Sequence, residues 1–344
     1  MKQNRIIEKG KLLNSDGDLA QKGYATNYVL EYDRNDIKAP KWRIKEWDYY
    51  YIGNDSYGLA LTISDVGLLG TVTLSIIDLE NAKEIAKNGV ALFPMGKFNM
   101  PSSPEIGSIS QKAGKIEMSF ENDGKVRRIT GFFPKVGKQK EDVKIDITLD
   151  QAPKEYMFIA TPFNKPKHFY YNAKINCLRA NGGFTWGDKF YPFENAPGVL
   201  DWGRGVWTYE NTWYWGSMQT WLPDGKPFGF NIGYGFGDTS AATENVIFYD
   251  GKIHKLEHVK FNIPGEDEGK DDYLKPWTFT SSDGRLEMDF EPVFDRNSEI
   301  RVGPLAMMPH QVFGKFSGTA ILDDGTKIQF KDVMGFAEKV HNKW

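Results

Sequence analysis

A carboxylate and a guanidinium lie within a short aromatic segment near the middle of the chain, Asp201-Trp-Gly-Arg-Gly-Val-Trp207. Indoles exclude water, and the loss of water penalises the charged form of a carboxyl, so Asp201 is a candidate general acid. Arg204 is near enough in sequence to pair with Asp201, and that pair would instead be structural. Gly203 and Gly205 would let the backbone turn and keep the approach to a ligand free.

Tryptophan is concentrated in and after this segment. Trp207, Trp213, Trp215 and Trp221 are all odd-numbered, so an unbroken strand would place them on one face, with Tyr209 between them. Such a wall can stack on sugars, line a pocket for a polyene or steroid, fill a β-domain core or form a protein interface. The residue types alone do not separate these four roles.

Further polar residues lie where strands are expected to begin or end. Glu244 and Asn245 start an apolar strand, and strand-end side chains commonly line the mouth of a barrel. His310 follows a proline and has the side chain best suited to proton transfer near neutral pH, although a lone His is commonly structural. Glu210 and Glu338 add two carboxyls that could position or transfer protons.

One motif is misleading. His254-Lys-Leu-Glu257-His258 matches the H-x-x-E-H pattern of some zinc proteases, which requires a helix. Here the segment runs into an alternating strand pattern, which would hold the two histidines roughly 13 Å apart, too far to share one ion. Walker loops, dinucleotide glycine fingerprints and G-x-S-x-G are also missing from the sequence, so we expect neither a metal nor a cofactor.

The segments that must position these residues have the sequence pattern of β-strands. Val143, Ile145, Ile147 and Leu149 alternate with polar residues, the period of a half-buried strand. Asp-Gly pairs recur between such segments and are typical of tight hairpin turns, at Asp123-Gly124, Asp224-Gly225, Asp250-Gly251, Asp283-Gly284 and Asp324-Gly325. The only helix-like stretch is Leu79–Asn88. The pattern predicts an antiparallel all-β protein with little helix.

Two short internal matches indicate a duplicated β domain. Gly114–Phe120 resembles Gly284–Phe290, and Gly198-Val-Leu-Asp201 resembles Gly335-Phe-Ala-Glu338 in the same order. The second match places Glu338 in the position of Asp201. We therefore expect one β domain with an N-terminal extension over residues 1–200 and a second over 201–344.

Composition limits the class of protein. The 344 residues are 40% hydrophobic and 26% charged, which excludes disorder. The net charge of −3 gives no reason to expect a nucleic-acid partner. No apolar run is long enough to span a membrane and no signal peptide is recognisable. A single cysteine, Cys177, cannot form an internal disulfide, so we expect a cytoplasmic monomer or homodimer.

Several of these segments together resemble domain-of-unknown-function family 2804. The resemblance covers nearly the whole chain, and the segments that carry it are Gly10-Lys-Leu-Leu13 with Asp16-Gly17, Asp201-Trp-Gly-Arg-Gly205, Glu244-Asn245-x-x-Phe248-x-Asp250-Gly251, Gln311-Val-Phe-Gly314-x-Phe-Ser-Gly318 and Gly335-Phe-Ala-Glu338. More loosely, the chain is similar to carotenoid 1,2-hydratase, tocopherol cyclase and AttH-type proteins. That similarity implies two lipocalin-like β domains, an apolar ligand and acid–base chemistry on a C=C bond, and no catalytic residue is carried over from it.

The sequence thus predicts two tandem lipocalin-like antiparallel β-barrel or sandwich domains that bind a hydrophobic small molecule such as a lipid, isoprenoid or steroid. An enzyme of this kind would hydrate, cyclise or isomerise its substrate. Asp201 and Glu338 are the candidate acids, with Arg204 and His310 as further catalytic candidates. The candidate ligand-binding residues are Trp207, Trp213, Trp215, Trp221, Tyr209, Glu210, Glu244 and Asn245.

Two alternatives come from other functional classes. A non-catalytic lipid carrier needs the aromatic cavity but no buried carboxyl. A carbohydrate-active protein would stack sugars on the same tryptophans, with two carboxyls about 5 to 10 Å apart at an open cleft.

Overall fold

The computed structural model describes residues 2–150, 153–302 and 305–343. Within them almost all regular structure is β, as the sequence predicts, and helix is limited to three short 3-10 turns, η1 (Arg34–Asp36), η2 (Lys41–Arg43) and η3 (Glu266–Glu268). Strand β11 (Glu141–Asp150) illustrates the cause, because its apolar residues are buried at every second position and its polar residues are exposed.

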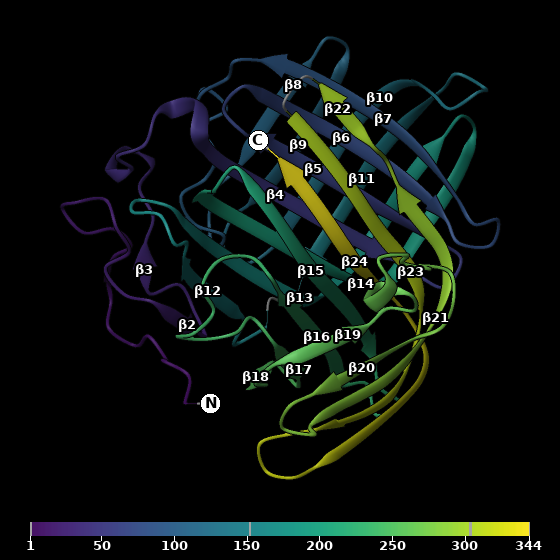
Figure 1. The fold of residues 1–344 in the computed structure, drawn as a ribbon. Helices are drawn as coiled ribbons and strands as arrows, with labels where there is room; N and C mark the ends of the chain where they lie inside the picture. The colour runs from purple at the N-terminus through teal and green to yellow at the C-terminus, as the bar shows by residue number, and fades with distance from the viewer. Residues whose placement is uncertain (1, 151–152, 303–304, 344) are drawn as a thin grey trace.

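The strands form two large antiparallel sheets (Figure 1). The first sheet contains β2 (Gly23–Ala25), β4 (Ile44–Gly53), β5 (Tyr57–Asp65), β6 (Leu69–Asp78), β7 (Lys83–Leu92), β8 (Ile109–Ala113), β9 (Ile116–Asn122), β10 (Arg127–Val136), β11, β12 (Met157–Pro162), β13 (Phe169–Trp186) and β14 (Lys189–Val206). A separate pair, β1 (Gly10–Lys11) and β3 (Leu30–Glu31), is parallel.

The second sheet follows in sequence. Its strands are β15 (Glu210–Trp221), β16 (Pro227–Tyr234), β17 (Val246–Tyr249), β18 (Lys252–Lys255), β19 (Val259–Asn262), β20 (Trp277–Ser281), β21 (Leu286–Asn297), β22 (Ile300–Val302), β23 (Leu305–Ile321) and β24 (Lys327–Lys343). The first sheet curls into a nearly closed barrel and the second into a half-barrel, which gives the predicted pair of tandem lipocalin-like units.

The two sheets repeat one strand order. The first runs β7-β6-β5-β4-β14-β13-β11-β10-β9-β8, and the second runs β18-β17-β16-β15-β24-β23-β21-β20-β19, so only β8 at the end of the first order has no counterpart in the second. Strand β14 therefore corresponds to β24, which is the pairing that the match between Asp201 and Glu338 predicts. The match between Gly114–Phe120 and Gly284–Phe290 does not follow this order, because it joins β9 to β21 whereas β21 takes the place of β11.

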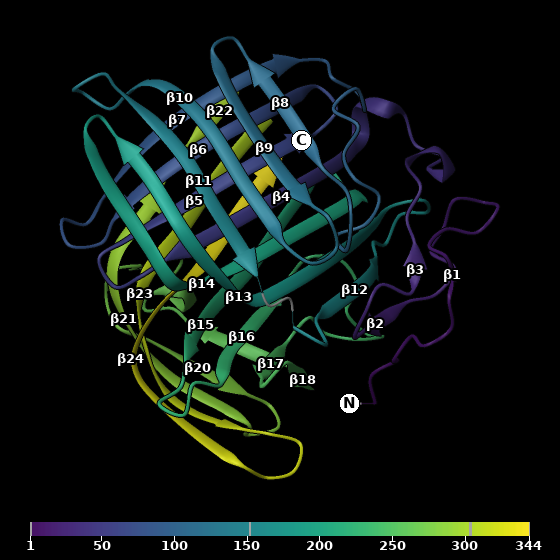
Figure 2. The ribbon, with the colours of Figure 1, turned by 180° about the vertical axis from the view of Figure 1, so that it is seen from behind.

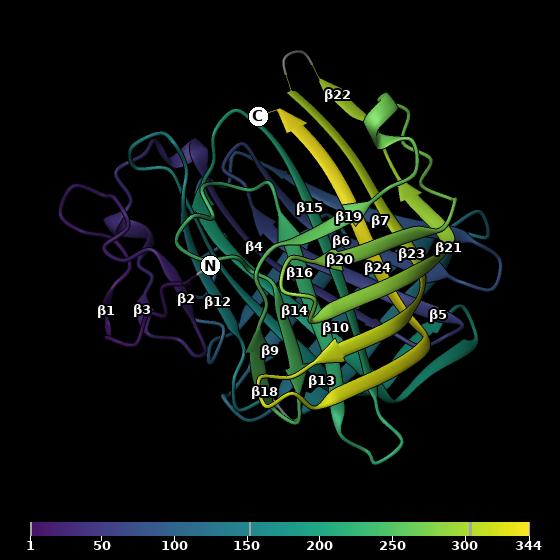
Figure 3. The ribbon, with the colours of Figure 1, turned by 60° about the horizontal axis from the view of Figure 1, so that its bottom comes forward.

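Each sheet encloses an apolar core, and two smaller clusters lie between the sheets. Phe133, Phe184 and Trp202 belong to the first core, and Phe230 and Trp277 belong to the second. Viewed from behind, strands β8 to β11 of the first sheet come forward, whereas the tilted view brings the second sheet forward (Figures 2 and 3).

The predicted hairpins are present, and the helix-like stretch is not a helix. All five Asp-Gly pairs join consecutive antiparallel strands, and at Asp250-Gly251 both residues have positive φ, 50° and 79°. Residues 79–88 form a turn and the start of β7, because pairing with β6 outweighs the weak helical pattern. No helix in the described part of the chain is long and apolar enough to cross a membrane.

Candidate functional site

The layer between the two sheets, which we call the seam, contains an aromatic and polar cluster. The seam is bounded by β4, β13 and β14 of the first sheet and by β15, β16, β23 and β24 of the second. Its apolar part includes Tyr51 from β4, Trp215 from β15 and Phe313 from β23, which are buried against one another. The polar part is built around Asp201 and Glu338.

Strand alternation decides which residues of β14 reach the seam. Asp201 and Gly203 face the second sheet, whereas Trp202 and Arg204 point into the first barrel. The predicted pair of Asp201 and Arg204 is therefore wrong, because the two side chains leave β14 on opposite faces.

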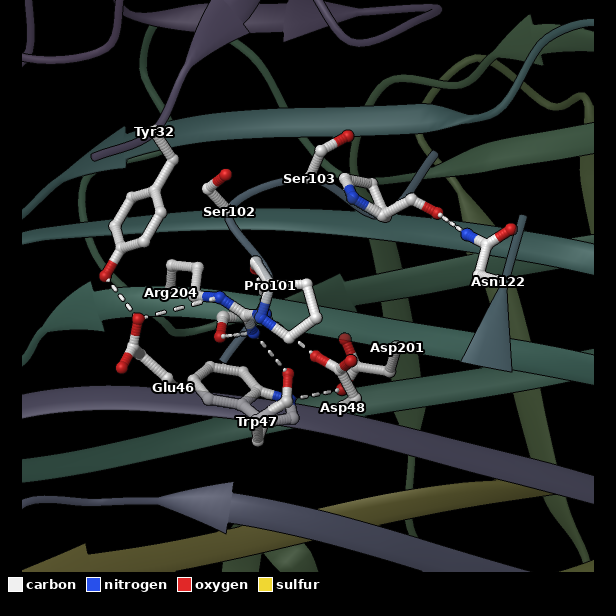
Figure 4. A network of polar contacts seen from close by, with 12 residues as sticks. Tyr32, Glu46, Trp47, Asp48, Pro101, Ser102, Ser103, Asn122, Asp201 and Arg204 are labelled. Carbon is white, nitrogen blue, oxygen red and sulfur yellow. Dashed lines mark hydrogen bonds and ion pairs between the residues drawn. The ribbon is translucent and has the colours of Figure 1, made fainter. Parts of the chain in front are cut away.

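Arg204 belongs to a separate buried network inside the first barrel (Figure 4). Its guanidinium lies 3.0 Å from Asp48 Oδ1 and donates a 2.7 Å hydrogen bond to the carbonyl of Pro101. It also donates to the carbonyl of Trp47 at 2.8 Å. Arg204 thus binds the backbone at Trp47 and at Pro101, and its bond to the Trp47 carbonyl connects it to the seam.

Asp201 is surrounded by three donors. Lys174 Nζ lies 3.0 Å from Oδ1, Asn172 Nδ2 donates to the same oxygen at 2.5 Å, and Trp47 Nε1 donates to Oδ2 at 3.1 Å. The Lys174 side chain is only 3% exposed and lies 4.1 Å from the ring centroid of Trp215. Every one of these partners is a donor, and one of them is a cation.

Glu338 has a similar position and a different environment. Trp213 Nε1 donates to Oε1 at 3.0 Å and Gln311 Nε2 donates to Oε2 at 3.2 Å, so its partners are neutral. Burial raises the pKa of Glu338 to about 7, against the opposing effects of the Trp213 hydrogen bond and the Lys174 charge. Glu338 is therefore a carboxyl that can hold or release a proton near neutral pH.

The two carboxyls are related by the repeat. Asp201 is the cross-strand neighbour of Lys174 and Tyr49, and Glu338 is the cross-strand neighbour of Gln311 and Trp215. Each carboxyl accepts a hydrogen bond from an indole on the adjacent strand, Trp47 for Asp201 and Trp213 for Glu338. In the second unit Gln311 takes the position of Lys174, and Pro309 takes the position of Asn172, so both the cation and one further donor are absent beside Glu338.

Glu244, from the connection between β16 and β17, is a third seam carboxyl. Its Oε2 lies 3.9 Å from Lys174 Nζ, and Asn231 Nδ2 donates to its carbonyl oxygen at 3.0 Å. Asn231 is held by Trp215, whose Nε1 donates to Asn231 Oδ1 at 2.7 Å. Burial raises the pKa of Glu244, and Lys174 opposes this rise.

Aromatic rings cover one side of the carboxyls. Trp207 lies 5.4 Å from Trp47, 6.1 Å from Trp213 and 5.0 Å from Phe236 between ring centroids, and Tyr170 stacks on Trp47 at 6.2 Å. Trp207 lies in the connection between β14 and β15, so it does not share a strand with Trp213 as the odd numbering predicts. It nevertheless packs beside Trp213.

Gly203 leaves room for one of these rings. A Cβ at position 203 would lie 1.9 Å from the Trp47 ring, so a side chain there would displace the indole that donates to Asp201. The space beside Gly203, which the sequence predicts to be open to a ligand, is instead occupied by the Trp47 ring.

Four other predicted site residues lie away from the carboxyls. His310 faces the other side of β23, where Nδ1 lies 2.8 Å from Asp295 Oδ2 and the ring stacks on Tyr273. Tyr209 is exposed, and Glu210 pairs with Lys343 at 3.0 Å on the surface. Trp221 lies further along β15, where its Nε1 donates to the carbonyl of Asn195.

Asn245 has a structural role, because its Nδ2 donates to the carbonyl of Glu257 and its Oδ1 accepts from Gly233 N. His254 of the H-x-x-E-H motif lies elsewhere, where its Nδ1 is 3.2 Å from Asp323 Oδ2. Among the described residues, no three His, Cys, Asp or Glu side chains form a group able to hold a metal ion.

Sequence reasoning missed Trp47, Lys174 and Gln311. A signal existed, because Trp47-Asp-Tyr49 and Trp213-Tyr-Trp215 share an indole two residues before an aromatic ring. Aligning the two halves through Asp201 and Glu338 then places Lys174 opposite Gln311, but only once the strand pairing is known.

Comparisons with known proteins agree with the fold. A family model described as "Domain of unknown function (DUF2804)" matches residues 3–344. The solved structure of an AttH-like protein from Nitrosomonas europaea has a TM-score of 0.53 and 14% identity, covering 90% of this chain and 96% of its own. Kievitone hydratase from Nectria haematococca has a TM-score of 0.49 and 13% identity, covering 97% and 98%. No curated protein matches the sequence.

Proposed function

The chain belongs to the family described as Domain of unknown function (DUF2804), and we propose that its seam binds a hydrophobic small molecule and performs acid–base chemistry on it. The observation that carries the proposal is the pair of equivalent carboxyls in unlike environments. Asp201 is paired with Lys174 at 3.0 Å, and burial raises the pKa of Glu338 to about 7. Two titratable groups whose environments differ in this way are typical of an acid and its partner base.

In the proposed reaction Glu338 donates its proton to an alkene carbon of the ligand. The π electrons form the new C–H bond, and the adjacent carbon becomes cationic. The indoles of Trp207 and Trp213 lie where they can stabilise this cation by cation–π attraction. Water then adds to the cation and gives up a proton to a seam carboxylate, which is hydration, or the cation itself loses a neighbouring proton, which is isomerisation.

The burial of the two carboxyls favours this function over a passive carrier. A carrier requires the aromatic wall alone, yet Asp201 and Glu338 are only 7% and 9% exposed and are both hydrogen bonded to indoles. Burying carboxyls beside a wall meant only for a lipid would cost stability without benefit. The aromatic rings also contact one another, which supports a closed apolar site more than an open sugar-binding groove.

Native mass spectrometry of the protein purified from its own host tests ligand binding. The proposal expects a retained small molecule in the wild type, its loss in Trp213→Ala, and its retention in a matched surface variant, Tyr209→Ala. Equal retention of the molecule by folded Trp213→Ala and by the wild type would mean that the tryptophans pack the core and do not bind the ligand.

A further inference from the structure

A hollow lies further along the seam, away from the carboxyls. Its volume is about 220 Å³, and it lies between β13 of the first sheet and β16 to β18 of the second. The residues that line it are Pro153, Lys154, Asn176, Cys177, Pro227, Phe248, Tyr249, Asp250, Gly251 and Lys252.

A bulge in β13 forms the inner wall of this cavity. Pairing with β14 shifts between Ile175 and Leu178, so that two residues, Asn176 and Cys177, lie opposite the single residue Val199 of β14. Cys177 has a φ of 61°, and both side chains turn toward the second sheet. Asn176 bonds to side chains of β15, and Cys177 packs in the same cluster as Phe248. Bulges commonly re-aim side chains in this way near functional sites.

The Asn176 amide is only half satisfied. Its Nδ2 has three acceptors, Ser217 Oγ at 2.8 Å, Gln219 Oε1 at 2.8 Å and the carbonyl of Phe230 at 3.3 Å. Its Oδ1 has no hydrogen-bond partner, although the residue is 0% exposed. An unpaired buried acceptor carries a desolvation cost that a bound donor would remove.

The outer rim is charged. Lys154, Asp250 and Lys252 are exposed, whereas Phe248 is buried in the wall. Neither lysine forms an ion pair with any residue in the described part of the chain, so the rim has two cations to one carboxylate. The residues that line the cavity therefore include two rim lysines, the apolar side chains of Phe248 and Cys177, and Asn176 with its unpaired Oδ1.

We propose that this cavity binds a single-ring phenol that carries an acidic substituent, with the hydroxyl donating to Asn176 Oδ1 and the anion near Lys154 and Lys252. The volume agrees, since an apolar cavity of about 150 Å³ accommodates benzene. The proposal is independent of acid–base chemistry at Glu338, because none of the three seam carboxyls lines this cavity.

Titration of the full chain with three probes, followed by isothermal calorimetry, tests this site. We expect 4-hydroxybenzoate to bind most tightly, and benzoate to bind roughly tenfold more weakly because Asn176 Oδ1 is again left unpaired. Phenol should also bind more weakly, because it has no anion for the rim. Equal affinities for benzoate and 4-hydroxybenzoate, or no saturable binding of any probe, would overturn the proposal.

Variants separate the two ends of the site. Asn176→Leu should abolish the preference for 4-hydroxybenzoate over benzoate, and Lys252→Met should weaken both benzoates while leaving phenol unchanged. Cys177→Met should weaken all three probes by filling the cavity. Because Asn176→Leu also removes hydrogen bonds to β15, the exposed Lys252→Met variant remains decisive if that protein does not fold. An unchanged 4-hydroxybenzoate affinity in Lys252→Met would contradict the proposed orientation.

Discussion

At the scale of single residues, the donors around each carboxyl set its charge. Asp201 faces the ammonium of Lys174, whereas Glu338 faces the amide of Gln311 and an indole. Desolvation therefore acts on Glu338 with little compensation and raises its pKa to about 7. The equivalent positions of the two repeats thus carry carboxyls in unlike environments.

Glu338 should make stability depend on pH. Its pKa of about 7 in the folded protein exceeds the ordinary value of 4.5, so the folded state binds the extra proton. The contribution is fully present below pH 4.5 and is lost as the pH rises to about 7, a loss of about 3 kcal/mol at most. Urea unfolding of the wild type and Glu338→Gln between pH 5 and 8 measures it, and parallel pH profiles would contradict this assignment.

Lys174 should contribute to the stability of the folded protein mainly by compensating the charge of Asp201. Replacing Lys174 by Met leaves the buried Asp201 carboxylate without its cation and should lower the free energy of unfolding by about 3 to 5 kcal/mol. The double variant Lys174→Met with Asp201→Asn should recover part of that loss, because the uncompensated charge is gone. Denaturant unfolding of the wild type, the two single variants and the double variant measures the coupling, and strictly additive losses would argue against the pair.

At the scale of elements, strand register brings the site together. Strands β4, β14 and β13 place Trp47, Asp201 and Lys174 side by side, and β15, β24 and β23 do the same for Trp213, Glu338 and Gln311. The close approach of Trp47 to β14 depends on the missing side chain of Gly203.

Gly203→Ala should therefore displace Trp47 and break its hydrogen bond to Asp201. We expect a loss of about 1 to 3 kcal/mol in unfolding free energy, together with a changed near-ultraviolet dichroism. Gly10→Ala is the matched control, because no atom lies within 4 Å of its added Cβ. Equal stability of the two variants would show that the seam accommodates the methyl group.

The arrangement of the strands also explains which features could be predicted from the sequence. Alternation along β11 and the Asp-Gly turns depend on neighbouring residues, so the all-β class and the hairpins follow from the sequence. The repeat correctly pairs Asp201 with Glu338 because β14 and β24 are equivalent strands. Lys174 and Trp47 could not be assigned, since their roles depend on cross-strand neighbours far away in sequence.

At the scale of the whole molecule, the site exists only where the two sheets meet. Arg296 of β21 links them, because its guanidinium bonds to Glu84 and Ser75 of the first sheet and to Gln311 of the second. Gln311 in turn donates to Glu338, so packing of the sheets and the state of the acid are coupled.

Arg296→Met should loosen the contact between the sheets and raise the pKa of Glu338 further, because the Arg296 charge opposes its rise. Hydrogen exchange should become faster in β7 and β21. Arg301→Met is the control, since Arg301 is exposed and pairs with Glu299 in its own unit. Identical hydrogen exchange in the two variants would show that Arg296 does not couple the packing of the sheets to Glu338.

In the proposed reaction Glu338 delivers a proton to a molecule bound in the seam. This step can be followed by incubating the retained molecule with the protein in D₂O and measuring the mass of the molecule. We expect a new C–D bond with the wild type, and binding without deuterium incorporation with Glu338→Gln. Equal incorporation by both proteins, or none by a wild type that binds the molecule, would contradict it.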